Sequence, residues 1–123
     1  MNRIKLQNST VEQLIAQFLD IALRQHEAMR RNRNSEYNRL FDQMEAVEQE
    51  LRKRTGDQRR ALLPLLDHPN PQVRLKSAIA TLSIAPVMAR QTLQTISDRE
   101  EYPEAVDARE MMRALDEGRF IPS

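Results

Sequence analysis

The scarcity of glycine is the feature that most limits what this 123-residue chain can fold into. It has two glycines against six prolines. Hairpin-rich β-folds and the phosphate-binding loops of nucleotide-binding folds need several glycines, because their backbones take positive φ or approach a ligand closely. We therefore exclude nucleotide-binding α/β folds and expect helices punctuated by prolines. The length predicts a single domain over residues 1–123.

Apolar residues recur every three to four positions, which is the spacing of one buried helix face. The first such stripe predicts a helix over residues 10–30, begun by a capping box of Ser9 and Glu12. A second stripe, from Tyr37 to Leu51, predicts a helix that ends near Gly56. Asp57 is a candidate N-cap for a third helix.

The later helices are expected to begin at prolines. Asn70 as N-cap and Pro71 as first helical residue predict a fourth helix whose stripe runs to Leu82. A fifth, starting at Pro86, and a sixth, starting at Pro103, carry the apolar residues Val87, Leu93, Ile96, Val106, Met111, Ala114 and Leu115. The sequence predicts about six helices in three hairpins.

Part of this pattern repeats. Val73 and Val106 are 33 residues apart, as are Leu82 and Leu115, and a period of this size built from helical hairpins is typical of solenoids. Residues 62–74 (LLPLLDHPNPQVR), with the small residues 77–78 that follow, resemble a HEAT repeat of the HEAT/armadillo type. The resemblance weakens in the next hairpin, where Val106 is followed by Asp107 instead of arginine.

This resemblance implies a fold and no activity. It implies an all-α, short right-handed α-α superhelix, in which Asp67 and Arg74 are structural residues that pair locally or with an adjacent repeat; a ligand contact by Arg74 is the alternative. Length and layout are also similar to a small bacterial family of unknown function with this fold.

The sequence contains no complete catalytic or metal-binding motif. His26 and Glu27 begin a zinc-protease HExxH motif, but Arg30 occupies the position of the second histidine ligand. His68 is the only other histidine, and we expect it in a solvated turn or, alternatively, lining a surface used by a partner. Cysteine is absent, which removes thiolate chemistry. We predict no catalytic residues, no metal and no cofactor; a small hydrolase with an unrecognised carboxylate site is a further alternative.

The net charge of +1 conceals an uneven distribution. Segment 98–117 is acidic, whereas segment 52–60 is basic through Arg52, Lys53, Arg54, Arg59 and Arg60. A basic cluster of this kind can neutralise nucleic-acid phosphates, but no aromatic residue interleaves with it to stack on bases. A solvated helix end and attraction between the basic and acidic segments are the competing interpretations.

We therefore expect a non-enzymatic protein-interaction module. The resemblance implies a concave face presenting Gln72, Lys76, Arg109 and Arg113. The expected partner is another protein, or a second copy of the chain. The alternative is a nucleic-acid-binding protein that uses the basic segment. Residues 1–7 lack the apolar stretch of a signal peptide and no run is long enough to span a membrane, so we expect a soluble, cytoplasmic protein without a membrane partner.

Overall fold

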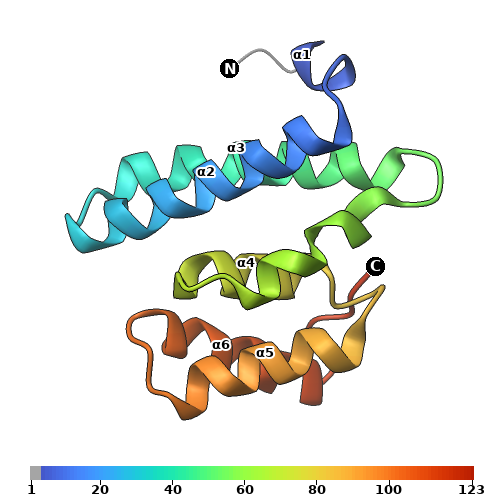
Figure 1. The fold of residues 1–123 in the computed structure, drawn as a ribbon. Helices are drawn as coiled ribbons and strands as arrows, with labels where there is room; N and C mark the ends of the chain where they lie inside the picture. Colours follow the sequence, from blue (N-terminus) through green and yellow to red (C-terminus); the bar gives the residue numbers. More distant parts are fainter. Residues whose placement is uncertain (1–3) are drawn as a thin grey trace. The chain divides into compact units, whose positions relative to one another are not determined.

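The computed structural model describes residues 4–123 and is all-helical, as predicted (Figure 1). Over these residues it contains no strand. Its elements are α1 (Ile4–Gln7), α2 (Val11–Arg30), α3 (Asn34–Lys53), the 3₁₀ helix η1 (Gln58–Asp67), α4 (Pro71–Ala80), α5 (Pro86–Asp98) and α6 (Glu104–Asp116). The right-handed superhelical sense stays a prediction.

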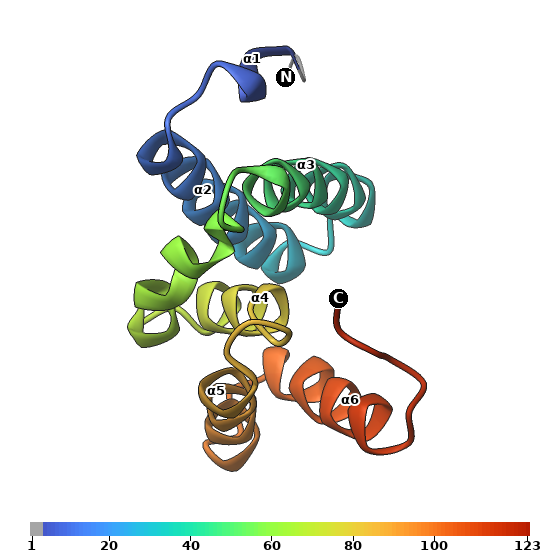
Figure 2. The ribbon, with the colours of Figure 1, turned by 90° about the vertical axis from the view of Figure 1, so that its right-hand side faces the viewer.

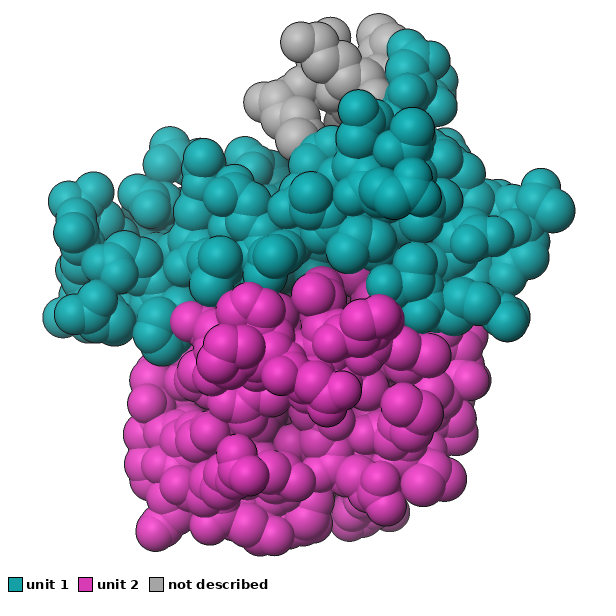
Figure 3. All heavy atoms as spheres, viewed as in Figure 1, with its two compact units in different colours: residues 1–61 teal, residues 62–123 magenta. Residues whose placement is uncertain are grey.

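The chain divides into two compact units, residues 1–61 and 62–123 (Figure 3). Each has its own helix packing, and each is described separately below. That the whole chain forms a single domain stays a prediction.

Unit 1 is built on the pair α2 and α3, which pack side by side (Figure 2). Leu14 and Phe18 of α2 and Val47 and Leu51 of α3 are completely buried, which confirms the apolar stripes predicted for both helices. The guanidinium of Arg54 holds the chain around α1 near the end of α3. Its Nη2 donates to the carbonyl oxygens of residues 6 and 9, at 2.9 Å each.

The capping box lies one residue later than the sequence analysis predicted. Thr10 is the N-cap of α2, and its Oγ1 accepts from the Gln13 amide at 3.1 Å while Gln13 Oε1 accepts from the Thr10 amide at 2.8 Å. Ser9 instead belongs to the turn after α1, because its amide donates to the carbonyl of residue 6.

The third predicted helix is a 3₁₀ helix, η1, which contains Pro64. Proline has no N–H to donate to the carbonyl four residues earlier and its ring crowds that carbonyl, so a regular α-helix cannot continue through this position. Asp57 stands at the N-cap position of η1, as predicted: its Oδ1 accepts from the Arg59 amide at 3.3 Å, although its φ is 51°.

Unit 2 contains α4, α5 and α6, and each of these helices packs on the other two. Together with the end of η1 they form one hydrophobic core. The buried residues of this core are Leu66, Leu75, Ala78, Leu82, Ala89, Leu93, Ile96, Ala105, Ala108 and Met112. The predicted starts hold: Asn70 Oδ1 caps α4 by accepting from the amides of residues 72 and 73 at 2.8 and 3.3 Å, and α5 begins at Pro86.

In unit 2, two apolar residues of the stripes predicted for the fifth and sixth helices face solvent instead of the core. Val87 is 69% exposed and Val106 is 57% exposed, whereas Val73, the repeat partner of Val106, is fully buried. The two positions are therefore not structurally equivalent. Val87 lies in the first turn of α5 and Val106 in the first turn of α6, and neither is a member of the unit 2 core.

Gly118 ends α6, as predicted, and its φ of 72° shows why glycine stands there. The Gly118 amide donates to the carbonyl of residue 115 at 3.2 Å, and the next amide donates to that of residue 114 at 2.9 Å. This pair of bonds is the Schellman motif, which requires a left-handed residue just beyond the helix end.

Candidate functional site

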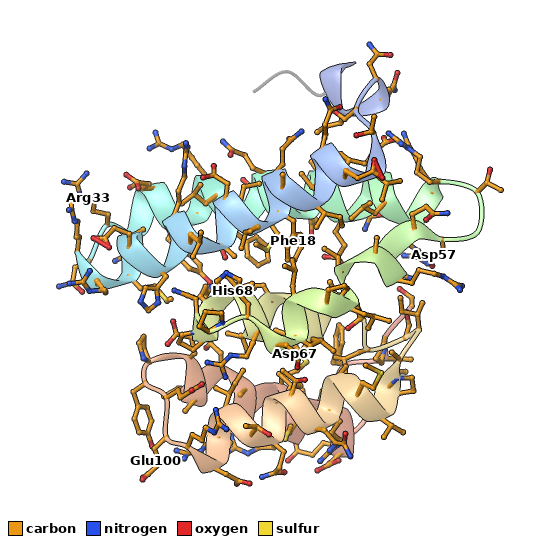
Figure 4. All side chains as sticks on the ribbon, in the orientation of Figure 1. Phe18, Arg33, Asp57, Asp67, His68 and Glu100 are labelled. Atoms are coloured by element: carbon orange, nitrogen blue, oxygen red, sulfur yellow. The ribbon has the colours of Figure 1, made fainter. Side chains whose placement is uncertain are left out.

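A groove of about 610 Å³ lies within unit 2, between the η1 segment with its following turn and helix α5. Figure 4 labels Asp67 and His68, which follow one another where η1 ends. The groove is lined by Leu63, Leu66, Asp67, His68, Pro69, Arg74, Met88, Gln91, Thr92, Thr95, Arg99 and Glu101. None of the four predicted concave-face residues lines it, but His68 and Arg74, which were named as alternative contacts of a partner or ligand, do.

One wall of the groove is a single face of α5. Its residues Met88, Gln91, Thr92, Thr95 and Arg99 follow the three-to-four spacing of a helix face. The hydroxyls of Thr92 and Thr95 donate to the main-chain carbonyls of residues 88 and 91, each at 3.0 Å. Because their protons are used within the helix, these hydroxyls offer a ligand lone pairs only.

The other wall combines apolar and polar residues. Leu63 and Leu66 are apolar, and Asp67 and His68, which follow them in the chain, are polar. His68 Nδ1 accepts a hydrogen bond from the Asn70 amide at 3.0 Å, so Nδ1 is unprotonated and the neutral ring carries its proton on Nε2. His68 can therefore donate a hydrogen bond through Nε2.

Arg74 and Glu101, which both line the groove, form a bidentate ion pair with each other. Arg74 Nη1 and Nη2 donate to Glu101 Oε2 and Oε1 at 2.7 and 3.0 Å. The same guanidinium donates to the carbonyls of His68 at 2.7 Å and Pro69 at 3.1 Å. Arg74 thus joins the turn before α4 to the turn after α5, which agrees with the expected pairing with an adjacent repeat, whereas Asp67 is not its partner.

The four predicted binding residues do not form one open surface. Gln72 is completely buried, so it cannot present its amide to a partner. Lys76 is half-buried. The structure places Arg109 against the C-terminal end of α5, where it donates to Ser97 Oγ and the Ser97 carbonyl, each at 2.9 Å.

Two further contacts complete the α6 arginines. The Arg109 guanidinium also donates to the Tyr102 hydroxyl and lies over the Tyr102 ring, 5.3 Å from its centroid. Arg113 is exposed and paired with Glu110 at 2.8 Å. These contacts lie within α6 and the turn before it. Both guanidiniums therefore have interaction partners within this chain.

Two carboxylates, Glu50 and Asp57, pair with three of the five cations of the basic segment. Glu50 pairs with Lys53 at 3.2 Å and Arg54 at 2.7 Å, and Asp57 pairs with the buried Arg59 at 2.7 Å. Arg52 and Arg60, like Lys53, are exposed. Three of the five predicted phosphate-binding cations are therefore held in ion pairs.

These ion pairs shift the acidity of their carboxylates. Burial works against the charged form of Glu50, yet the hydrogen bonds from Arg54 and Lys53 hold its pKa below the ordinary value. The hydrogen bond from Arg59 likewise holds the pKa of Asp57 below its ordinary value, against a smaller effect of burial. Both carboxylates are consequently anionic near neutral pH.

The acidic segment is also partly neutralised. Arg90 pairs bidentately with Asp116 at 2.7 and 3.0 Å, and Arg119 pairs with Glu110 and Glu117. Across the described part of the chain, no group of three or more histidine and carboxylate side chains is placed to hold a metal ion. In the same residues, no helix is both long and apolar enough to cross a membrane.

The fold and groove define a small all-helical protein with a polar cleft in its C-terminal half. The chain belongs to the family described as Domain of unknown function (DUF2019), whose model matches residues 12–116. It is similar to the protein RPA1889 from Rhodopseudomonas palustris, whose crystal structure superposes with a TM-score of 0.93 at 42% identity, covering 96% of this chain and 98% of that one. A comparison with curated proteins finds no match.

Sequence reasoning singled out Asp67, His68 and Arg74 but did not bring them together with α5. The one signal for the α5 wall is the polar spacing of Gln91, Thr95 and Arg99 on the side opposite the core residues of that helix. On its own that spacing is typical of any solvated helix face.

Proposed function

We propose that this chain is a non-enzymatic protein-binding module and that the groove of unit 2 is its recognition site. The observation that carries the proposal is the composition of the groove, whose lining combines apolar, charged and hydrogen-bonding side chains. Such a lining suits a polypeptide, which presents apolar side chains and main-chain donors and acceptors together.

The geometry of the groove argues against catalysis. A nucleophilic hydroxyl needs a base that accepts its proton, whereas the protons of Thr92 and Thr95 are donated to main-chain carbonyls. The Nδ1 of His68 is already bonded to a main-chain amide, and Glu101 is held by Arg74. The groove therefore holds no nucleophile paired with a base.

The nucleic-acid alternative is less well supported. Its proposed cations Lys53, Arg54 and Arg59 are each bound to a carboxylate of the same chain. Phosphate binding would have to displace those partners, which lowers the electrostatic gain on which such binding depends. A cytoplasmic location and self-association of the chain stay predictions.

Site-specific photo-crosslinking tests the proposal. A photoreactive amino acid at Gln91, exposed on the α5 wall, is expected to give a polypeptide adduct in cells. The same group at Asp107, exposed on α6 outside the groove, is expected to give none. A second substitution, Thr95→Trp, which fills the groove, should abolish the Gln91 adduct.

The outcomes separate the candidate partners. Equal adducts at Gln91 and Asp107, or no adduct at Gln91, would refute a binding groove. An adduct that is lost on nuclease treatment would favour the nucleic-acid alternative, and an adduct of twice the mass of the chain would identify a second copy as the partner. Circular dichroism of each variant checks that its helix content is unchanged.

A further inference from the structure

A short segment precedes the two long helices of unit 1. This segment, which we call the N-terminal strap, comprises residues 4–9 and contains the four-residue helix α1 (Figure 1). A helix of this length is not stable on its own in water, so contacts with the rest of the unit must hold it in place. Helix α1 packs on α3.

The strap has one buried side chain among those that the structure describes. Leu6 is 4% exposed, whereas Gln7 and Asn8 are exposed. A single leucine removes far less apolar surface from water than the buried stripes of α2 and α3 do. The apolar contribution to closing the strap is therefore small beside the one that holds the two long helices together.

Arg54 ties the main chain of the strap to the end of α3. Its Nη2 donates to the carbonyls of Leu6 and Ser9, at 2.9 Å each, while its Nε donates to Glu50 Oε2 at 2.7 Å. The Arg54 side chain is 24% exposed and that of Glu50 is 7% exposed, so water can only partly replace these bonds. One planar guanidinium thus connects the strap with the last turn of α3.

Glu50 has a second cationic partner that does not reach the strap. Its Oε1 pairs with Lys53 at 3.2 Å, and its Oε2 pairs with Arg54. The Lys53 side chain is 62% exposed, and among the described residues Glu50 is its partner. The two cations therefore allow a matched comparison, because they share a carboxylate but only Arg54 binds the strap.

A hollow of about 340 Å³ lies between the strap and α3. Leu6 and Gln7 form its wall on the strap, and the opposite wall is one face of α3 that runs from Asp42 to Lys53. The strap is thus not closely packed along its whole length. Its displacement would remove one wall of the hollow and uncover this face of α3.

We infer that the N-terminal strap is a conformational device, which opens from α3 while α2 and α3 stay packed, and that Arg54 is the latch that keeps it closed. Opening breaks two bonds from Arg54 to strap carbonyls and exposes one leucine. Segments with few buried apolar contacts open at a lower free energy than the core does. Any ligand of the uncovered α3 face would compete with the strap. The inference concerns unit 1 and is independent of the proposed function.

Thiol labelling of the folded protein tests this inference, because the chain has no cysteine of its own. Leu6→Cys places a thiol under the strap, and Leu51→Cys places one in the buried stripe of α3. Labelling by a maleimide, followed by mass spectrometry, should be at least about tenfold faster for Leu6→Cys. Below the unfolding transition it should hardly depend on urea, since opening exposes little surface, whereas labelling of Leu51→Cys should rise steeply with urea.

Variants of the latch are compared within the Leu6→Cys chain, so that any loosening caused by that substitution is common to all of them. Arg54→Ala should accelerate labelling about ten- to a hundredfold, as expected for the loss of hydrogen bonds from a charged group. Lys53→Gln, which removes the other cation of Glu50, should change the rate by less than about twofold. Arg54→Lys keeps the positive charge but loses the planar guanidinium, so its rate should lie between those of the unsubstituted latch and Arg54→Ala.

Two results would overturn the inference. If both thiols are labelled at the same rate and with the same urea dependence, the strap opens only when the whole unit unfolds. If the two Arg54 variants accelerate labelling no more than Lys53→Gln does, Arg54 is not the latch. Circular dichroism at 222 nm checks that each variant keeps its helix content, and Arg54→Lys provides the comparison if Arg54→Ala does not fold.

Discussion

Replacing the buried Arg74 should lower the unfolding free energy more than replacing any exposed side chain of unit 2. Its guanidinium makes two charge-assisted bonds to Glu101 and one each to the carbonyls of His68 and Pro69. The Arg74 side chain is 10% exposed and that of Glu101 is 21% exposed, so water can only partly replace what the substitution removes.

The expected cost of Arg74→Ala is about 2–4 kcal/mol of unfolding free energy. This range lies between one hydrogen bond to a charged group, about 1.5–3 kcal/mol, and the loss of one partner from a buried ion pair, about 3–5 kcal/mol. The measurement is urea unfolding at 25 °C followed by circular dichroism at 222 nm. Arg74→Lys keeps the positive charge but loses the planar guanidinium, so its unfolding free energy should lie between those of the unsubstituted chain and Arg74→Ala.

A double-mutant cycle with Glu101→Gln isolates the pair itself. If the ion pair contributes as its geometry indicates, the coupling energy between the two substitutions should be about 1–3 kcal/mol. A cost below about 1 kcal/mol for Arg74→Ala, or two substitutions whose effects simply add, would show that the two turns are held together by something other than this contact.

Three further predictions concern single residues. Asn70→Ala removes the cap that accepts from two amides of α4, and should lower the unfolding free energy by about 1 kcal/mol in urea titrations. Gly118→Ala forces a side chain into a φ of 72° and should cost about 1–2 kcal/mol, measured in the same way. The pKa of Asp57 is lowered in the folded state, so its pairing with Arg59 stabilises the fold fully above the unfolded-state pKa of about 4. This stabilisation is lost as the pH falls through the folded-state pKa. The difference in unfolding free energy between the unsubstituted chain and Asp57→Asn should therefore shrink between pH 5 and pH 2, and a difference independent of pH would contradict this.

The helices could be predicted from sequence because local rules decide them. The apolar spacing located α2 and α3, and the side-chain cap at Asn70 with the following proline fixed the start of α4. Where two neighbouring residues are both good caps, as with Ser9 and Thr10, local rules could not choose, and the turn after α1 decided the register. The proline in η1 was visible, but its effect on the helix type was not anticipated.

The groove could not be predicted because it depends on contacts distant in sequence. Arg74 and Glu101 are 27 residues apart, and nothing in the spacing of the sequence shows that they meet. The resemblance implied that Asp67 and Arg74 pair locally or with an adjacent repeat. Arg74 does pair with Glu101 of the next hairpin, whereas Asp67 is exposed in the groove. Gln72 was predicted to lie at the surface, but it is buried. The polarity of a side chain does not by itself show whether the side chain is exposed.

The position of η1 suggests that limited proteolysis can separate the two units of the chain. Arg60 is exposed, lies within this 3₁₀ helix, and immediately precedes Ala61, the last residue of unit 1. Hydrogen bonds in 3₁₀ helices are poorer than those in α-helices, so trypsin should cut after Arg60 sooner than after the exposed basic residues within α3. Mass spectrometry of a limited digest should then find fragments 1–60 and 61–123 first, and Arg60→Gln should suppress them. One brief protease treatment would thereby yield both halves of the protein for separate folding measurements.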